Sequence, residues 1–210
     1  MSELNLGPLR ANRKIYRLMH SMRNCYGIEI NKNKHIANGL GGVADGIDGD
    51  LSIDIGFNPR TERDGLLTKV NDYDFIDAIR ALYHEEQHLI QSCWLYQDKN
   101  PSEDVILMAT HKLATQNNRK YYINTYRTDL AEIDAEGTAI FKAYGYLKTE
   151  FPDVDAERLI CNLINDKASD GPGYKSCYFI KGHFDSIGNI MNAFSNQFER
   201  AKNAQVSIMR

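Results

Sequence analysis

Two histidines and a glutamate with a distinctive spacing stand near the middle of the chain. His84 and His88 are four residues apart, and Glu85 directly follows the first histidine. Because residues i and i+4 share one face of a helix, both imidazoles can point at a single metal ion, for which Zn²⁺ is the natural choice. Glu85 would project beside that face, where it can accept a proton from a water that the metal activates. The spacing therefore predicts a metal centre with a general base next to it.

The segment around this motif has the periodicity of a helix that begins at Asp72 and ends near Leu95. His84, His88 and Gln91 fall on one side of it, and apolar residues form a stripe on the other. The stripe consists of Phe75, Ile76, Ile79, Leu82, Tyr83, Ile90, Cys93 and Trp94. Glu86 interrupts it. Since a buried carboxylate without a partner is costly, we expect a basic partner, a local water or a partly open face at Glu86.

A third metal ligand is expected from an acidic helix over residues 129–147. A catalytic zinc usually has three protein ligands and one open position. Helical projection places Glu132 and Glu136 on one face, whereas Asp134 points away and is expected to be solvated. We predict Glu132 as the third ligand, with Glu136 accepting a hydrogen bond from the outer N–H of a liganding histidine. The reversed assignment, with Glu136 as the ligand, stays open.

The combination of His84-Glu85-x-x-His88 with Glu132-x-x-x-Glu136, 44 residues further on, resembles the gluzincin branch of the zincin metallopeptidases. The resemblance covers about residues 75–95 and 129–147. It implies a zinc-dependent hydrolase that cleaves a peptide or protein substrate. It also implies an edge strand that lines the cleft and pairs with extended substrate, a part that falls to the strand expected at Leu51–Phe57.

The residue that would stabilise the oxyanion carries no motif. Tyr121, Tyr122, Tyr126 and His183 are all candidates. This gap and the charged Glu86 leave an alternative, in which a zincin-like binding or structural protein holds a zinc ion without proteolysis. A helical interaction protein without a metal is a third interpretation. A di-iron carboxylate bundle is excluded for a single chain, because a second E-x-x-H motif is missing from the sequence.

The remaining pattern predicts an α+β fold. An amphipathic helix is expected over residues 9–24, short strands at 27–30 and 35–37, and the clearest period-2 strand at 51–57. Helices are expected at about 102–115, 129–147, 156–167 and near the end of the chain. We therefore predict a single domain over residues 1–210, with a small N-terminal sheet packed on the active-site helix in a first lobe (1–98) and a mainly helical second lobe (99–210). The resemblance implies that this domain is zincin-like.

Composition bounds the function classes. The 210 residues are 42% hydrophobic and 25% charged, which is typical of a globular protein. A net charge of −3 gives no general reason to expect nucleic-acid binding. No signal peptide or membrane-length apolar run is visible, so a cytoplasmic protein without a membrane partner is expected. The four cysteines are scattered without a C-x-x-C pair, which favours reduced thiols over a disulfide framework or a second zinc site.

Overall fold

The computed structural model describes residues 4, 6, 8–26, 29–32, 42–45, 52–55, 72–97, 99–116, 128–169 and 178–208. Its elements in chain order are α1 (Pro8–Tyr26), β1 (Glu29–Lys32), β2 (Gly42–Asp45), β3 (Ser52–Ile55), α2 (Asp72–Gln97), α3 (Glu103–Gln116), α5 (Leu130–Glu150), α6 (Ala156–Ala168) and α7 (Ile187–Ile208). For the strands the structure describes the backbone alone.

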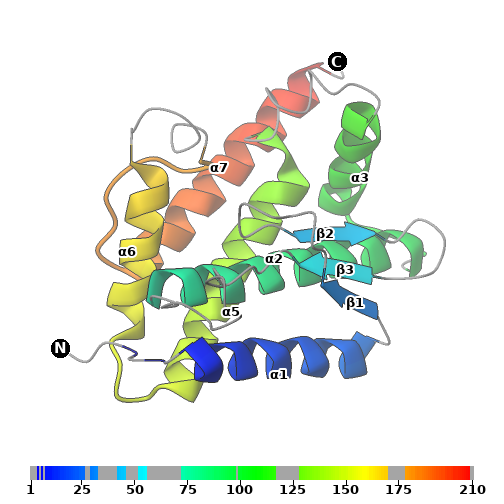
Figure 1. Ribbon diagram of the computed structural model, residues 1–210. Coiled ribbons are helices and arrows are strands. Elements are labelled where there is room, and N and C mark those ends of the chain that lie inside the picture. The colour runs from blue at the N-terminus through cyan, green and yellow to red at the C-terminus, as the bar shows by residue number, and fades with distance from the viewer. Residues whose placement is uncertain are drawn as a thin grey trace.

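Helix α5 is the element on which the molecule is built. Figure 1 shows it running through the middle of the fold with α2 crossing it, and this pair makes the most extensive contact between any two described elements. Helices α3, α6 and α7 also pack on α5, while α1 lies against α2. Ala135, Ala139 and Ala143 are fully buried, and their small side chains allow a neighbouring helix to come close. The two helices that carry the metal motif are therefore the centre of the fold.

Helix α2 is buried on both faces. The predicted apolar stripe is present in the core, where Phe75, Ile79 and Leu82 are fully buried. The opposite face is buried as well, since His84 is 7% and His88 8% exposed. The side chains of Cys93 and Trp94, which belong to the predicted stripe, lie outside the described residues. The predicted separation of α2 into an apolar face and a polar face is confirmed, but protein encloses the polar face too.

Glu86 has the basic partner that its position in the apolar stripe requires. Lys142 Nζ donates to Glu86 Oε2 at 2.8 Å, and the same ammonium lies 5.8 Å from the centre of the Tyr83 ring. Lys142 belongs to α5, so the pair joins α5 to α2. Of the three alternatives expected at Glu86, a basic partner is the one that the structure shows.

The start of α5 is fixed by its N-cap. Asp129 has an extended backbone, and its carboxylate accepts a hydrogen bond from Ala131 N at 3.0 Å. Such a cap satisfies one of the free N–H groups of the first turn. Because Glu132 stands in that first turn, the cap also determines where the predicted third ligand lies.

The three strands form a small mixed sheet in the order β1-β3-β2. Strand β3 pairs in parallel with β1 and antiparallel with β2, and β2 contacts α2 (Figure 1). The edge-strand role expected of Leu51–Phe57 is wrong. Its strand, β3, has a neighbour hydrogen-bonded on each side, so its backbone cannot pair with an extended substrate.

The predicted α+β class is also wrong. Helix accounts for 81% of the residues whose side chains the structure describes, and none of these residues lies in a strand. The helices have 13 to 26 residues, whereas each strand has four. Alternation along residues 27–57 indicated a sheet as a structural layer, but the described core is made by helix packing. The fold is helical, with a short sheet attached beside α2. None of the helices described is both long enough and apolar enough to cross a membrane.

Candidate metal centre

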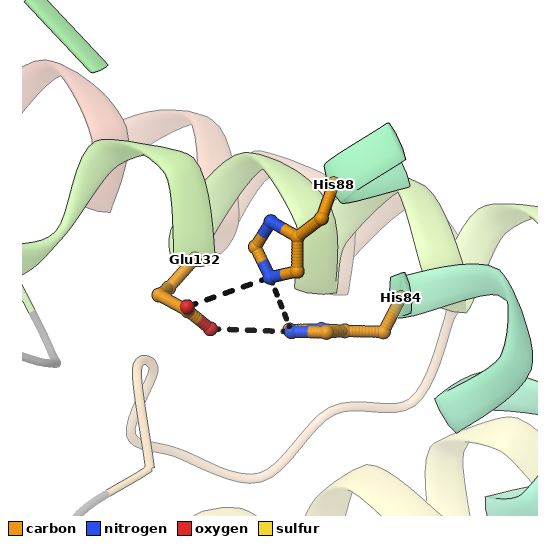
Figure 2. Close-up of side chains that lie close together, drawn as sticks. All are labelled: His84, His88 and Glu132. Atoms are coloured by element: carbon orange, nitrogen blue, oxygen red, sulfur yellow. Dashed lines mark hydrogen bonds and ion pairs between the residues drawn. The ribbon is translucent and has the colours of Figure 1, made fainter. Parts of the chain in front are cut away.

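His84 and His88 of α2 and Glu132 of α5 converge on one point. Figure 2 shows the two imidazoles and the carboxylate facing one another across the α2–α5 contact. His84 Nε2 lies 3.1 Å from His88 Nε2 and 3.2 Å from Glu132 Oε2, and His88 Nε2 lies 3.4 Å from Glu132 Oε1. Among the described residues these three form a group whose ligand atoms could hold a metal ion.

The spacing of the three ligand atoms fits a tetrahedral ion. Zinc binds histidine nitrogen and carboxylate oxygen at about 2.0–2.2 Å, so two ligands on a tetrahedron stand about 3.3–3.5 Å apart. The separations of 3.1, 3.2 and 3.4 Å are close to this value. Three donors that face one point so closely need either a cation or a shared proton between them. The donor set, with two imidazoles and one carboxylate, suits zinc and similar divalent transition metals.

His84 is oriented by a buried carboxylate behind it. Its Nδ1 lies 2.9 Å from Glu136 Oε2, and Glu136 is only 2% exposed. A carboxylate can only accept there, so Nδ1 carries a proton and Nε2 is the atom left to face the metal position. Arg80 also donates to Glu136 Oε2, and the Tyr178 hydroxyl donates to Oε1 at 2.7 Å. Every oxygen of this carboxylate therefore has a partner.

Arg80 connects the site to a wider buried network. It stands one helical turn before the first histidine, and its Nε donates to Asp77 Oδ1 at 2.6 Å. Lys167 of α6 lies 3.0 Å from the same Asp77 oxygen. The network alternates in charge, from Lys167 through Asp77 and Arg80 to Glu136. This alternation matters because a buried charge without a partner would be strongly destabilising.

The carboxylates set the proton affinity of His84 in the metal-free site. Burial lowers its pKa, but the hydrogen bonds and negative charges of Glu132 and Glu136 outweigh burial and raise it to about 10. For Glu132 and Glu136 burial acts in the opposite direction and raises the pKa, but hydrogen bonds and positive charges outweigh it. The histidine hydrogen bonds lower the pKa of Glu132 well below its usual range, and the Arg80 charge does so for Glu136. A proton on His84 thus takes the place of a cation.

His88 is oriented by a neutral partner instead. Its Nδ1 lies 2.9 Å from Gln91 Oε1, one turn further along α2. The Gln91 amide donates to Ala131 O at 2.9 Å and to Asp134 Oδ2 at 2.7 Å, both on α5. Asp134 was expected to be solvated. It is half-buried instead, because α2 covers it and both Gln91 and Gln87 donate to it.

The remaining predicted site residues are distributed as follows. Glu85 is buried on α2 beside the first histidine. Tyr121, Tyr122 and Tyr126 lie outside the described residues. His183 is exposed, in the loop before α7, and the structure describes no contact between it and the triad. Its role in oxyanion stabilisation stays a prediction, as does that of the three tyrosines.

Sequence reasoning missed two residues that support the site, Arg80 and Tyr178. Arg80 precedes His84 by four residues, so the projection that grouped the two histidines could also have placed it on their face. Tyr178 carried no such signal. It lies 42 residues after Glu136, where its ring packs against Phe179 and Phe194 and its hydroxyl reaches the Glu136 carboxylate.

No family model, curated protein or solved structure matches this chain significantly.

Proposed function

We propose that the protein is a zinc-dependent hydrolase, most specifically a metallopeptidase. The observation that carries the proposal is the convergence of His84 Nε2, His88 Nε2 and the Glu132 carboxylate at tetrahedral spacing. Two neutral imidazoles and one carboxylate leave a divalent ion with a net positive charge. Three protein ligands also leave it one open position, which is the arrangement of catalytic zinc sites.

In this proposal the ion, when bound, polarises the substrate carbonyl and lowers the pKa of a water. His84, His88 and Glu132 hold it, while Glu136 fixes the first of the two histidines in the correct tautomer. Glu85 acts as general base, accepting a proton from the attacking water on a carboxylate oxygen and delivering it to the leaving amine nitrogen. Its sequence position next to His84 supports this role.

The experiment that tests this proposal separates metal binding from turnover. Zinc-loaded wild type and Glu85→Gln would be incubated with a library of unstructured peptides, with cleavage followed by mass spectrometry. We expect wild type to cleave, and Glu85→Gln to keep one zinc per chain while losing about 10²–10⁴-fold in rate. Glu103→Gln, an exposed α3 residue, serves as the matched control. Cleavage by Glu85→Gln at the wild-type rate would refute the assigned base.

A second candidate is a zinc-stabilised protein without hydrolytic activity. The observation that favours it is enclosure. Both histidines are buried, and the Glu132 side chain is only 14% exposed. Metal removal would then unfold the protein, while the zinc-loaded chain would cleave no peptide. A hydrolase instead keeps its helical circular-dichroism spectrum after chelation and loses its activity.

A further inference from the structure

Gln91 contacts both helices that build the candidate metal centre. Its side-chain oxygen lies 2.9 Å from His88 Nδ1, on its own helix. Its side-chain nitrogen donates to Ala131 O at 2.9 Å and to Asp134 Oδ2 at 2.7 Å, on α5. Ala131 is the residue that precedes Glu132. One amide therefore joins the second histidine ligand to the turn of α5 that carries the carboxylate ligand.

The surroundings leave this amide only one orientation. Ala131 O and Asp134 Oδ2 are acceptors that cannot donate, so the NH₂ group must face them. Turned over, the amide would place its oxygen against a carbonyl and a carboxylate and lose both bonds. Gln91 Oε1 must then face His88, and because it can only accept, Nδ1 of His88 must carry the proton.

This proton assignment determines what His88 presents to the triad. A neutral imidazole with its proton on Nδ1 has its lone pair on Nε2, the atom that lies 3.1 Å from His84 Nε2 and 3.4 Å from Glu132 Oε1. With the proton on Nε2 instead, that nitrogen could not bind a metal. The Gln91 amide thus selects the tautomer in which His88 is a ligand.

We propose that Gln91 is a positioning residue of the metal centre, which fixes the ligand tautomer of His88 and the distance between His88 and Glu132. Asp134 holds the Gln91 amide in its required orientation. The inference deepens the proposed metal-dependent function and rests on it. Gln91 itself touches no substrate and takes no part in bond making.

Gln87 provides a matched control. It is a buried glutamine one turn earlier on α2, and its amide donates to the same Asp134 oxygen at 2.9 Å. No contact between Gln87 and either histidine is described. Gln87→Leu and Gln91→Leu remove equivalent donors from Asp134, but only Gln91→Leu removes the acceptor of His88 Nδ1–H.

The test measures zinc affinity by competition with a chromophoric chelator, for wild type and both variants. Outer partners of liganding histidines typically contribute about 10–100-fold in affinity. We expect a loss in that range for Gln91→Leu and less than about threefold for Gln87→Leu. Equal affinities for wild type and Gln91→Leu, or equal losses in the two variants, would overturn the proposal.

A second readout works without metal. In ¹⁵N-edited spectra of the metal-free protein, the His88 ring should show a slowly exchanging Nδ1–H, which Gln91→Leu abolishes and Gln87→Leu retains. In the metal-free wild type, a neutral His88 ring with its proton on Nε2 would overturn the proposal, because that nitrogen could not bind a metal. Absence of peptide cleavage by zinc-loaded wild type, with the Nδ1–H signal in place, would instead refute the proposed hydrolase function alone, whereas absence of zinc binding would overturn both proposals.

Discussion

The two histidine ligands are held in opposite ways. His84 is backed by Glu136, a fully enclosed carboxylate whose charge is balanced by Arg80 and by the histidine itself. His88 is backed by the neutral amide of Gln91, which is balanced by acceptors on α5. The first arrangement rests on several buried charges, whereas the second rests on amide hydrogen bonds to a backbone carbonyl and to the half-buried Asp134 carboxylate. We therefore expect substitutions behind His84 to lower the free energy of unfolding most, and substitutions behind His88 to lower metal affinity most.

The strongest test of this difference is to remove the positive charge of Arg80, which faces Glu136. Arg80→Met leaves the carboxylate of Glu136 without its main buried counter-charge and Asp77 with Lys167 alone. Loss of one partner from a buried ion pair costs about 3–5 kcal/mol. We expect the free energy of unfolding, measured with urea, to fall by that amount.

Arg158→Met is the control for this change. Arg158 is about one-third exposed and lies 4.0 Å from Asp155, so its removal should cost no more than about 1 kcal/mol. A loss of equal size in both variants would contradict the view that the His84 side rests on buried charge.

Neutralising Glu136 should affect both properties at once. Glu136→Gln keeps an oxygen that can accept from His84 Nδ1 but loses the negative charge that Arg80 faces. We expect zinc affinity to fall about tenfold, the lower end for such partners, together with a loss of stability. Chelator competition and urea unfolding measure the two effects. Glu150→Gln, at the exposed end of α5, loses a partly exposed ion pair with Lys14, so it should cost no more than about 1 kcal/mol and leave zinc affinity unchanged.

The pH dependence of stability in the metal-free protein tests the charges around His84. The pKa of His84 is raised from 6.5 to about 10, so its contribution to stability is complete below pH 6.5 and is lost as pH rises through about 10. The lowered pKa of Glu132 and that of Glu136 act at the other end, since their contribution is present above pH 4.5 and is lost on acidification. The metal-free cluster is thus most stabilising between about pH 4.5 and 6.5.

We therefore expect the thermal midpoint of metal-free wild type to be lower at pH 9.5 than at pH 6 by about 3 °C or more. Saturating zinc should remove this decline, because a bound ion replaces the proton on His84. His84→Gln should show a much smaller difference between the two pH values. A midpoint that rises from pH 6 to pH 9.5 in the metal-free wild type would contradict the charge assignment at this histidine.

The smallest expected effect concerns the pair that joins α2 to α5 away from the ligands. Lys142→Met removes the partner of Glu86, which is 7% exposed, but the lysine itself is about one-third exposed. Water can reach the site, so we expect a loss of about 1 kcal/mol in urea unfolding and no change in zinc affinity. Loss of zinc binding in this variant would show that the helix contact, and not the individual supports, controls the metal site.

The sequence allowed the helical part of the site to be predicted because its periodicity is local. Spacing along 72–95 placed His84, His88 and Gln91 on one face, and projection along 129–147 separated Glu132 and Glu136 from Asp134. A basic partner was one of the possibilities expected for Glu86. Lys142 could not be identified as that partner, because no local pattern relates residues 56 positions apart.

What could not be predicted depends on tertiary contacts. Alternation along 51–57 indicates a strand, but it does not say whether neighbours pair on both sides, and the expected edge strand is the middle one. Nor does it say how much of the core a sheet contributes, which is why the fold class was wrong. Asp134 was assigned to solvent from the direction of its own helix face, and the α2 glutamines that cover it came from a different segment.

The central claim is that His84, His88 and Glu132 hold one divalent ion. Anomalous diffraction at the zinc edge, from crystals of the zinc-loaded protein, tests it most directly. The expected result is a single strong peak about 2.0–2.2 Å from His84 Nε2, His88 Nε2 and a carboxylate oxygen of Glu132. A zinc-loaded crystal without a peak between these three side chains, or with its peak elsewhere, would contradict the claim.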